Sequence, residues 1–204
     1  GVVVAACGDT PATTGTTSTS APAIATTSPG GHGEAGRDEA GRSLQSAIAA
    51  VGDDYGFSST VTVDGVQISG IEGAVQGDTG SYVVESGGAT LEYIVSPSGR
   101  WVRAPGADWV RLQGAVPVRA PLSLLAAPKS VEMVAQPEQD TIVRATYDAA
   151  SLGFAGEEIE VRITIRGGIL FSLEYGVAIG EGSASVVTLI TPDTSAAPIE
   201  LPDA

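Results

Sequence analysis

The stretch EIEVRITIR, residues 158–166, decides the fold class of this chain. Its branched apolar side chains stand at every second position, and glutamate, arginine and threonine fill the positions between them. Successive strand residues point to opposite faces of a sheet, so this alternation predicts a strand with one dry face and one wet face. The Gly167-Gly168 pair then predicts a hairpin turn into a second strand, with apolar positions at Ile169, Phe171, Leu173 and Tyr175.

The same period of two continues on both sides of this hairpin. From Tyr55 onward, apolar and hydroxyl-bearing residues alternate as far as Asp64-Gly65, a dipeptide that favours a tight hairpin turn. Further strands are predicted at residues 79–86, 90–95, 100–104, 108–112 and 183–191, separated by clusters of Gly, Pro, Asp or Ser. The pattern predicts a meander of roughly nine or ten antiparallel strands.

Two segments have a helical pattern instead. Asp38–Val51 carries one apolar stripe and ends at Gly52; the stripe consists of Leu44, Ala47, Ile48 and Val51. PLSLLAAP, residues 121–128, is a short helical segment between prolines. We therefore expect an α+β, mainly β domain at residues 38–192: a curved antiparallel meander with an N-terminal helix and a short mid-chain helix packed on the sheet. Such sparse helical cover would leave part of the dry face as a cavity for a hydrophobic ligand.

The N-terminal part of the chain differs in composition from this domain. In the stretch from Thr10 to Gly30, 14 of 21 residues are Thr, Ser or Pro, which predicts a disordered tether at residues 8–37. VAAC, residues 4–7, resembles the bacterial lipobox, so residues 1–7 would be the end of a signal peptide and Cys7 the lipidated residue. In the alternative interpretation Cys7 is a small buried residue of a first strand. Residues 193–204 form an acidic tail that contains proline.

The charge balance excludes one class of partner. Asp and Glu total 24 against 10 Lys and Arg, and the net charge is −14. Such a charge repels nucleic acid phosphates and anionic lipid head groups, so we expect no nucleic acid partner. The single cysteine excludes an internal disulfide.

No catalytic constellation is recognisable in the sequence. The only histidine, His32, lies in the predicted tether, which argues against a serine hydrolase triad or a histidine metal site. Glu157, Glu158 and Glu160, or Asp53 with Asp54, are paired carboxylates of the kind that glycosidases use, but we interpret them as a solvated strand face. The GDTG stretch at 77–80 lacks the lysine of a phosphate loop and predicts a turn. We expect neither an enzyme nor a bound cofactor or metal.

The tripeptide WVR occurs twice, at residues 101–103 and 109–111. Trp101 and Trp109 are the only tryptophans of the chain, and they flank the turn APGAD. They would either rim a pocket or pack the hairpin onto the core and pair across its strands.

The chain resembles the actinobacterial lipoproteins of the LppX/LprG type, which are similar to the LolA carriers. The resemblance lies in the order of its parts: lipobox, Thr/Ser tether, helix, a meander with GRWVR and ADWVRL, PLSLLAAP and final strands. The resemblance implies a half-barrel that binds, and transports, a lipid or acylated glycolipid between sheet and helices. It also implies a monomer on the outer face of the cytoplasmic membrane, anchored through acyl chains on Cys7, with an envelope protein as a further partner. Candidate residues for the ligand cavity are Leu122, Leu124, Leu125, Ile163, Phe171, Trp101 and Trp109. The alternative is a tethered acidic protein-interaction or sensor module without a small-molecule ligand.

Overall fold

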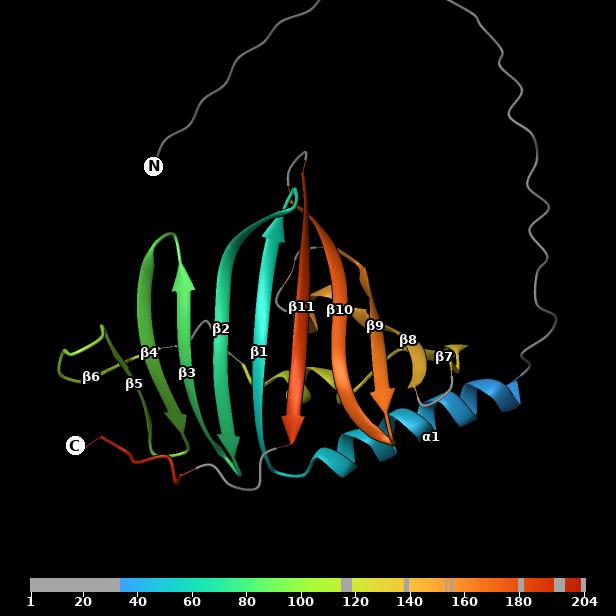
Figure 1. The fold of residues 1–204 in the computed structure, drawn as a ribbon, viewed down its shortest axis with the longest axis horizontal. Helices are drawn as coiled ribbons and strands as arrows, with labels where there is room; N and C mark the ends of the chain where they lie inside the picture. The colour runs from blue at the N-terminus through green and yellow to red at the C-terminus, as the bar shows by residue number, and fades with distance from the viewer. Residues whose placement is uncertain are drawn as a thin grey trace, which may run out of the picture. The chain divides into compact units, whose positions relative to one another are not determined.

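The computed structural model describes residues 34–114, 119–137, 140–152, 154, 156–179, 182–192 and 197–202. The fold is mainly β, with one N-terminal α-helix and one antiparallel sheet of 11 strands that is not closed into a barrel (Figure 1). The elements are α1 (Glu34–Val51), β1 (Asp54–Val63), β2 (Val66–Gln76), β3 (Thr79–Ser86), β4 (Ala89–Ser96), β5 (Gly99–Arg103), β6 (Val110–Arg111), η1 (Pro121–Leu125), β7 (Ser130–Ala135), β8 (Asp140–Asp148), η2 (Ala149–Leu152), β9 (Glu158–Arg166), β10 (Ile169–Ile179) and β11 (Gly182–Pro192). No helix within these residues is long and apolar enough to cross a membrane.

The sheet consists of two meanders that meet at its centre. Its strand order is β6-β5-β4-β3-β2-β1-β11-β10-β9-β8-β7. Every pair except β1 with β11 joins strands that are consecutive in sequence, and the consecutive strands β6 and β7 are the two edges. In that pair Phe57 lies opposite Ile190 and Ser59 opposite Thr188. The first and the last strand of the domain therefore lie side by side (Figure 1).

The two hairpin turns and the strand alternation predicted from the sequence are confirmed. Asp64 and Gly65 have φ values of 49° and 80°, and Gly167 and Gly168 have φ values of 58° and 82°. Two successive positive φ angles are typical of the type I′ turn, whose twist matches that of the flanking strands. In β9 the predicted alternation is also confirmed, because Ile159, Val161, Ile163 and Ile165 are buried in the core.

Helix α1 covers one half of a sheet face. Its apolar stripe is confirmed and packs against β7 and β10; Ala40, Leu44, Ala47 and Val51 are buried, and Ile48 is partly buried against them. The helix begins at Glu34, before the expected start at Asp38, and ends as predicted at Gly52, whose φ of 82° suits a helix C-terminus. We call the face under α1 the helix-covered face and the opposite face the open face.

The strand predictions needed three corrections. The expected strand at 108–112 is only the two-residue β6, since Arg111 is its last paired residue. The chain also forms β7 and β8, which were not predicted as separate strands. In β10 the register against β9 shifts between Leu170 and Ser172, so the expected apolar row from Ile169 to Tyr175 is wrong at Phe171. The Arg166 guanidinium lies 3.9 Å from the centroid of the Phe171 ring, and this ring lies outside the core cluster.

The mid-chain segment is a 3₁₀ helix, η1, that packs against the sheet. Leu125 is buried in the core, and Leu122 is partly buried against it. The hydroxyl of Tyr55 in β1 is hydrogen-bonded to the Leu122 backbone. Because β6 and β7 are opposite edges of the sheet, the connection between them has to cross a face, and the contact with Tyr55 places η1 near the centre of the helix-covered face.

The C-terminal residues are attached to the end of β2 through one side chain. The Gln76 Nε2 donates to the Ala197 carbonyl at 2.9 Å, and the Ile199 amide donates to the Gln76 Oε1 at 2.8 Å. Both hydrogen-bonding groups of this carboxamide are thus used by the tail. Within the expected tail of 193–204, residues 197–202 therefore have a defined position next to the β2–β3 turn.

The buried hydroxyl pair between β1 and β11 supports a prediction on stability. Ser59 Oγ and Thr188 Oγ1 are 2.7 Å apart, and both residues are buried. Ser59→Ala or Thr188→Val should each lower the free energy of unfolding by about 1–3 kcal/mol, because each leaves a buried hydroxyl without a partner. The double variant should lose less than the sum of the two, as measured by urea denaturation. Strictly additive losses would show that the two hydroxyls do not interact.

A second prediction concerns Tyr147 in β8. This residue is fully buried, and its hydroxyl has no hydrogen-bond partner within the described part of the chain. Tyr147→Phe should leave the free energy of unfolding unchanged or raise it by about 1 kcal/mol, since the unpaired hydroxyl is removed. Tyr55→Phe is the matched control and should lower it by about 1 kcal/mol, because it removes the hydrogen bond to Leu122. A clear loss of stability in Tyr147→Phe would contradict this interpretation.

Candidate functional site

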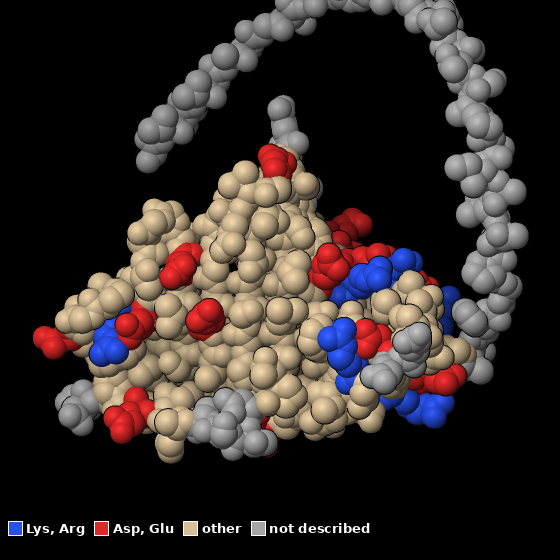
Figure 2. All heavy atoms as spheres, viewed as in Figure 1, with Lys and Arg blue, Asp and Glu red and all other residues tan. Residues whose placement is uncertain are grey.

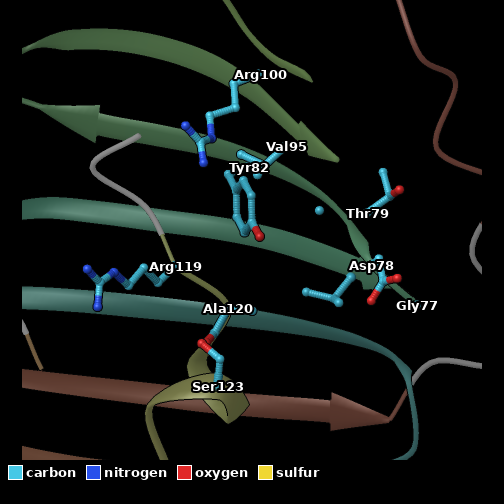
Figure 3. A pocket seen from close by; sticks show the side chains of 11 residues that line it. Gly77, Asp78, Thr79, Tyr82, Val95, Arg100, Arg119, Ala120 and Ser123 are labelled. Atoms are coloured by element: carbon cyan, nitrogen blue, oxygen red, sulfur yellow. The ribbon is translucent and has the colours of Figure 1, made fainter. Parts of the chain in front are cut away.

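A pocket of about 420 Å³ lies on the helix-covered face, between η1 and one end of β2, β3, β4 and β5 (Figure 3). It lies on the half of the face that β2–β5 form, whereas α1 packs against β7 and β10. Its lining combines a few apolar side chains with charged and hydroxyl-bearing ones: Val75, Gly77, Asp78, Thr79, Gly80, Tyr82, Val95, Arg100, Arg119, Ala120 and Ser123. Small-molecule sites are lined mainly by apolar and aromatic side chains with a few polar groups, and the lining of this pocket is more polar than that.

The pocket floor is the ring of Tyr82, which glycines allow to lie flat against the sheet. A Cβ at Gly80 would occupy the position of the Tyr82 hydroxyl. At Gly73, a Cβ would approach the Phe57 ring to 2.5 Å and the Tyr82 ring to 2.9 Å. Gly73 lies opposite Phe57 in β1 and opposite Tyr82 in β3, so its missing side chain lets rings two strands apart meet, with centroids 5.9 Å apart.

The Tyr82 hydroxyl is a hydrogen-bonding group at this floor. It has no hydrogen-bond partner among the residues that the structure describes, although the residue is only 4% exposed. Burial raises the pKa of Tyr82 above its ordinary value, so the phenol stays protonated at neutral pH. The floor therefore offers an O–H donor as well as an apolar ring surface.

One side of the pocket is formed by η1 and is held by hydrogen bonds. The Ser123 Oγ donates to the Ala120 carbonyl at 2.7 Å, which stabilises the first turn of η1. Burial raises the pKa of Tyr55 to about 12, while the hydrogen bond with the Leu122 backbone acts in the opposite direction. The neutral Tyr55 phenol thus connects η1 to the sheet beside the pocket.

Two arginines form the pocket rim. Arg100 comes from β5 and Arg119 from the segment that precedes η1, and Figure 3 shows both guanidinium groups on one side of the Tyr82 ring, with Asp78 and Thr79 on the other. The Arg100 Nη1 donates to the Gly114 carbonyl at 2.8 Å, and the Arg119 Nη1 donates to the Ser151 carbonyl at 3.5 Å. Within the described residues, neither arginine forms an ion pair.

The seven residues predicted to line a cavity lie elsewhere in the fold. Leu125 and Ile163 are buried in the main core, Leu122 is partly buried against it, and Leu124 is partly exposed on η1. Phe171 packs against Arg166, as described above. None of them lines the pocket beside η1, although Leu122, Leu124 and Leu125 belong to the helix that forms its wall. Their role in ligand binding stays a prediction.

The two tryptophans form reciprocal pairs with the arginines of the repeated WVR motif. The Arg111 guanidinium lies 5.9 Å from the Trp101 ring centroid, and the Arg103 guanidinium lies 4.3 Å from the Trp109 ring centroid. Trp101 is opposite Arg111 in the β5–β6 pairing, so each repeat supplies the partner of the other. Arg103 also forms an ion pair with Glu92 at 2.6 Å. The repeat thus holds the β5–β6 hairpin together by cation–π pairs.

The remaining candidates of the sequence are placed as follows. Cys7 and His32 lie outside the described residues. Glu158 and Glu160 are exposed and form ion pairs with Lys129 at 3.2 Å and Arg144 at 3.0 Å, as expected of a solvated strand face. Within the described residues, no group of three or more His, Cys, Asp or Glu side chains is arranged to hold a metal ion.

Sequence reasoning missed Tyr82, Arg100 and Arg119 as functional candidates. The available signal was the scarcity of cations, 10 in the whole chain, with Arg100 directly before the first WVR repeat. That signal does not show which arginines lie together, because β5 and the segment before η1 are brought to one pocket only by the path of the chain.

Comparison with known proteins identifies no family for this chain. No protein-family model matches the chain, and no curated protein matches it either.

Glycine substitutions on β2 test how the pocket floor is packed. Gly73→Ala should lower the free energy of unfolding by about 1–3 kcal/mol, because the Phe57 and Tyr82 rings must move to admit a methyl group. Gly70→Ala on the same strand is the matched control, since its Cβ would meet only the Gln67 Nε2 at 3.5 Å. Urea denaturation measures both. Equal effects of the two substitutions would show that the rings do not depend on Gly73.

Proposed function

We propose that this protein is a bacterial envelope lipoprotein that binds, and transports, a lipid-like ligand in the pocket beside η1. The observation that carries the proposal is the pocket itself: a hollow of about 420 Å³ with a buried aromatic floor and a polar rim on the helix-covered face. An amphiphile matches this arrangement, because its apolar part would cover Tyr82, Val75 and Val95 while its polar part meets the rim. The half-barrel architecture of the LolA-like carriers is part of the proposal.

The size of the pocket limits what it holds in this conformation. Small-molecule sites have volumes of roughly 300–1,000 Å³, so a pocket of about 420 Å³ accepts one chain or one head group rather than several acyl chains. Each methylene that leaves water contributes about 0.8 kcal/mol, so even a short apolar segment gives useful affinity. A ligand with several chains would require η1 to move away from the sheet. We propose that displacement of η1 accompanies the loading of larger ligands.

The proposed anchor is Cys7 in the VAAC stretch, which lies outside the described residues. Acyl chains on Cys7 would hold the domain at the outer face of the cytoplasmic membrane, since two or more chains give stable membrane attachment. The domain would work there as a monomer that passes its ligand to or from the membrane or an envelope protein. No enzymatic step is part of this proposal.

A second candidate function is a protein-interaction module, and the open face favours it. Figure 2 shows few charged side chains over the middle of the visible face, where β2, β1 and β11 lie in Figure 1. Val187 and Leu189 of β11 and Ile68 of β2 are exposed apolar residues; Leu189 is 43% exposed and Ile68 48%. Exposed aliphatic residues on a sheet face with few charged side chains are suited to contact with another protein.

Native mass spectrometry combined with organic extraction tests the carrier function. The Cys7→Ser chain, which lacks the acylation site, should retain about one lipid per protein after expression in a lipid-containing host, as a carrier pocket predicts. Ser123→Trp should abolish this retention, because the exposed Ser123 lines the pocket and an indole would fill it. Ala127→Trp, in the exposed segment just after η1, should retain the lipid.

The same experiment distinguishes the two candidate functions. A chain that is empty after purification and also refuses fatty-acid and monoacylglycerol probes would overturn the carrier function in favour of the protein-interaction module. Thermal unfolding, followed by circular dichroism, checks that Ser123→Trp and Ala127→Trp are equally folded. Retention of lipid by both tryptophan variants would place the ligand elsewhere on the protein.

A further inference from the structure

The two pocket arginines form a local excess of positive charge in a strongly acidic protein. The chain has a net charge of −14, and Arg103, Lys129, Arg144 and Arg166 are each paired with carboxylates. Arg100 and Arg119 instead hydrogen-bond to backbone carbonyls, and no carboxylate of the described residues compensates their guanidinium charge. Each guanidinium uses one donor in these contacts, and its other N–H groups have no partner in the described part of the chain.

Both arginines line one pocket, but only the Arg100 guanidinium lies beside the Tyr82 ring, whereas the Arg119 side chain extends away from that ring (Figure 3). The planar guanidinium group binds carboxylate and phosphate oxygens in pairs, with charge-assisted hydrogen bonds that are stronger than those between neutral groups. Arg100 would meet such a group beside the Tyr82 ring, and Arg119 would join it by turning its side chain from the Ser151 carbonyl toward the ring.

Asp78 makes the charge at one side of the pocket differ from that at the arginine side. Its carboxylate is on the other side of the Tyr82 ring, next to Thr79, and has no hydrogen-bond or ion-pair partner within the described residues (Figure 3). A carboxylate repels an anion and accepts hydrogen bonds from hydroxyl groups. An anionic group is therefore favoured at the arginine side, and ligand hydroxyls are favoured near Asp78 and Thr79.

The acidic character of the whole chain does not cancel this local preference. Charges separated by more than a Debye length, about 8 Å at physiological ionic strength, are largely screened at the surface. Groups that touch a ligand act at hydrogen-bond distance and are screened much less. The net charge therefore affects the approach of an anion, while Arg100 and Arg119 decide its binding.

We propose that Arg100 and Arg119 bind a phosphate or carboxylate group of the ligand, so that the pocket selects anionic over neutral amphiphiles. This inference rests on the proposed function, because it names the chemical class of the ligand that the pocket beside η1 carries. The apolar part of such a ligand covers the Tyr82 ring, Val75 and Val95.

Titration calorimetry with matched single-chain probes tests the selection. The Cys7→Ser full chain is titrated with oleoyl lysophosphatidic acid, oleoyl lysophosphatidylcholine and monoolein below their micelle concentrations, and separately with inorganic phosphate. We expect the anionic lipid to bind at least about tenfold more tightly than monoolein, which is the size of effect that charge-assisted hydrogen bonds give. Inorganic phosphate should bind more weakly than the anionic lipid, because it lacks the apolar part.

Three variants connect the selection to the two arginines. Arg100→Gln and Arg119→Gln should each weaken binding of the anionic lipid about tenfold and leave binding of monoolein unchanged. Arg162→Gln is the matched control: it causes the same change in net charge at an exposed position of β9 that does not line the pocket. It should leave all affinities unchanged.

The outcomes separate the failure of this inference from that of the proposed function. Equal affinities for the three lipids, unaffected by either arginine substitution, would keep the carrier function and overturn the anion selection. Binding of inorganic phosphate as tight as that of the anionic lipid would overturn the lipid head group as the source of the anion. No binding of any lipid, together with arginine-dependent binding of phosphate, would overturn the proposed function and support the anion site alone.

Discussion

The antiparallel pairing of β1 with β11 is the contact on which the rest of the structure depends. Every other strand pair in the sheet joins neighbours in sequence through a hairpin or a short connection, whereas this pair joins the two ends of the domain. Its register places Phe57 opposite Ile190 and the Ser59 hydroxyl opposite that of Thr188. Since a slip by one residue would turn every apolar side chain to the other face, the buried row of β1 and β11 determines this register.

The central position of that pair has a consequence for the edges of the sheet. Because the two meanders meet at β1 and β11, their other ends, β6 and β7, become opposite edges, and the connection between them must cross a face of the sheet. The crossing segment contains η1, which the Tyr55 hydroxyl and the buried Leu125 attach to the helix-covered face. The pocket follows from this path, because η1 crosses beside β2–β5 while α1 packs against β7 and β10.

Within the pocket, small residues matter as much as large ones. Gly73 and Gly80 carry no side chain at the positions where the Phe57 and Tyr82 rings lie. The aromatic floor therefore depends on the space that these two glycines leave beside the backbone. In the same way, the polar side of the pocket depends on two arginines that lack a carboxylate partner among the described residues. A net charge of −14 argues against anionic partners for the protein as a whole. It gives no information on a local excess of positive charge such as that of the two arginines.

The sequence by itself determined the elements whose signals are local. The alternation in β9, the Asp64-Gly65 and Gly167-Gly168 turns and the apolar stripe of α1 were all recognisable, because they depend on residues within one or two turns of chain. Only the tertiary structure decided the strand order, the bulge that removes Phe171 from the core row, the Trp–Arg pairs of the WVR repeats and the placement of Arg100 and Arg119 at one pocket. These features depend on contacts between residues far apart in sequence or across strands, and periodicity carries no information about such contacts.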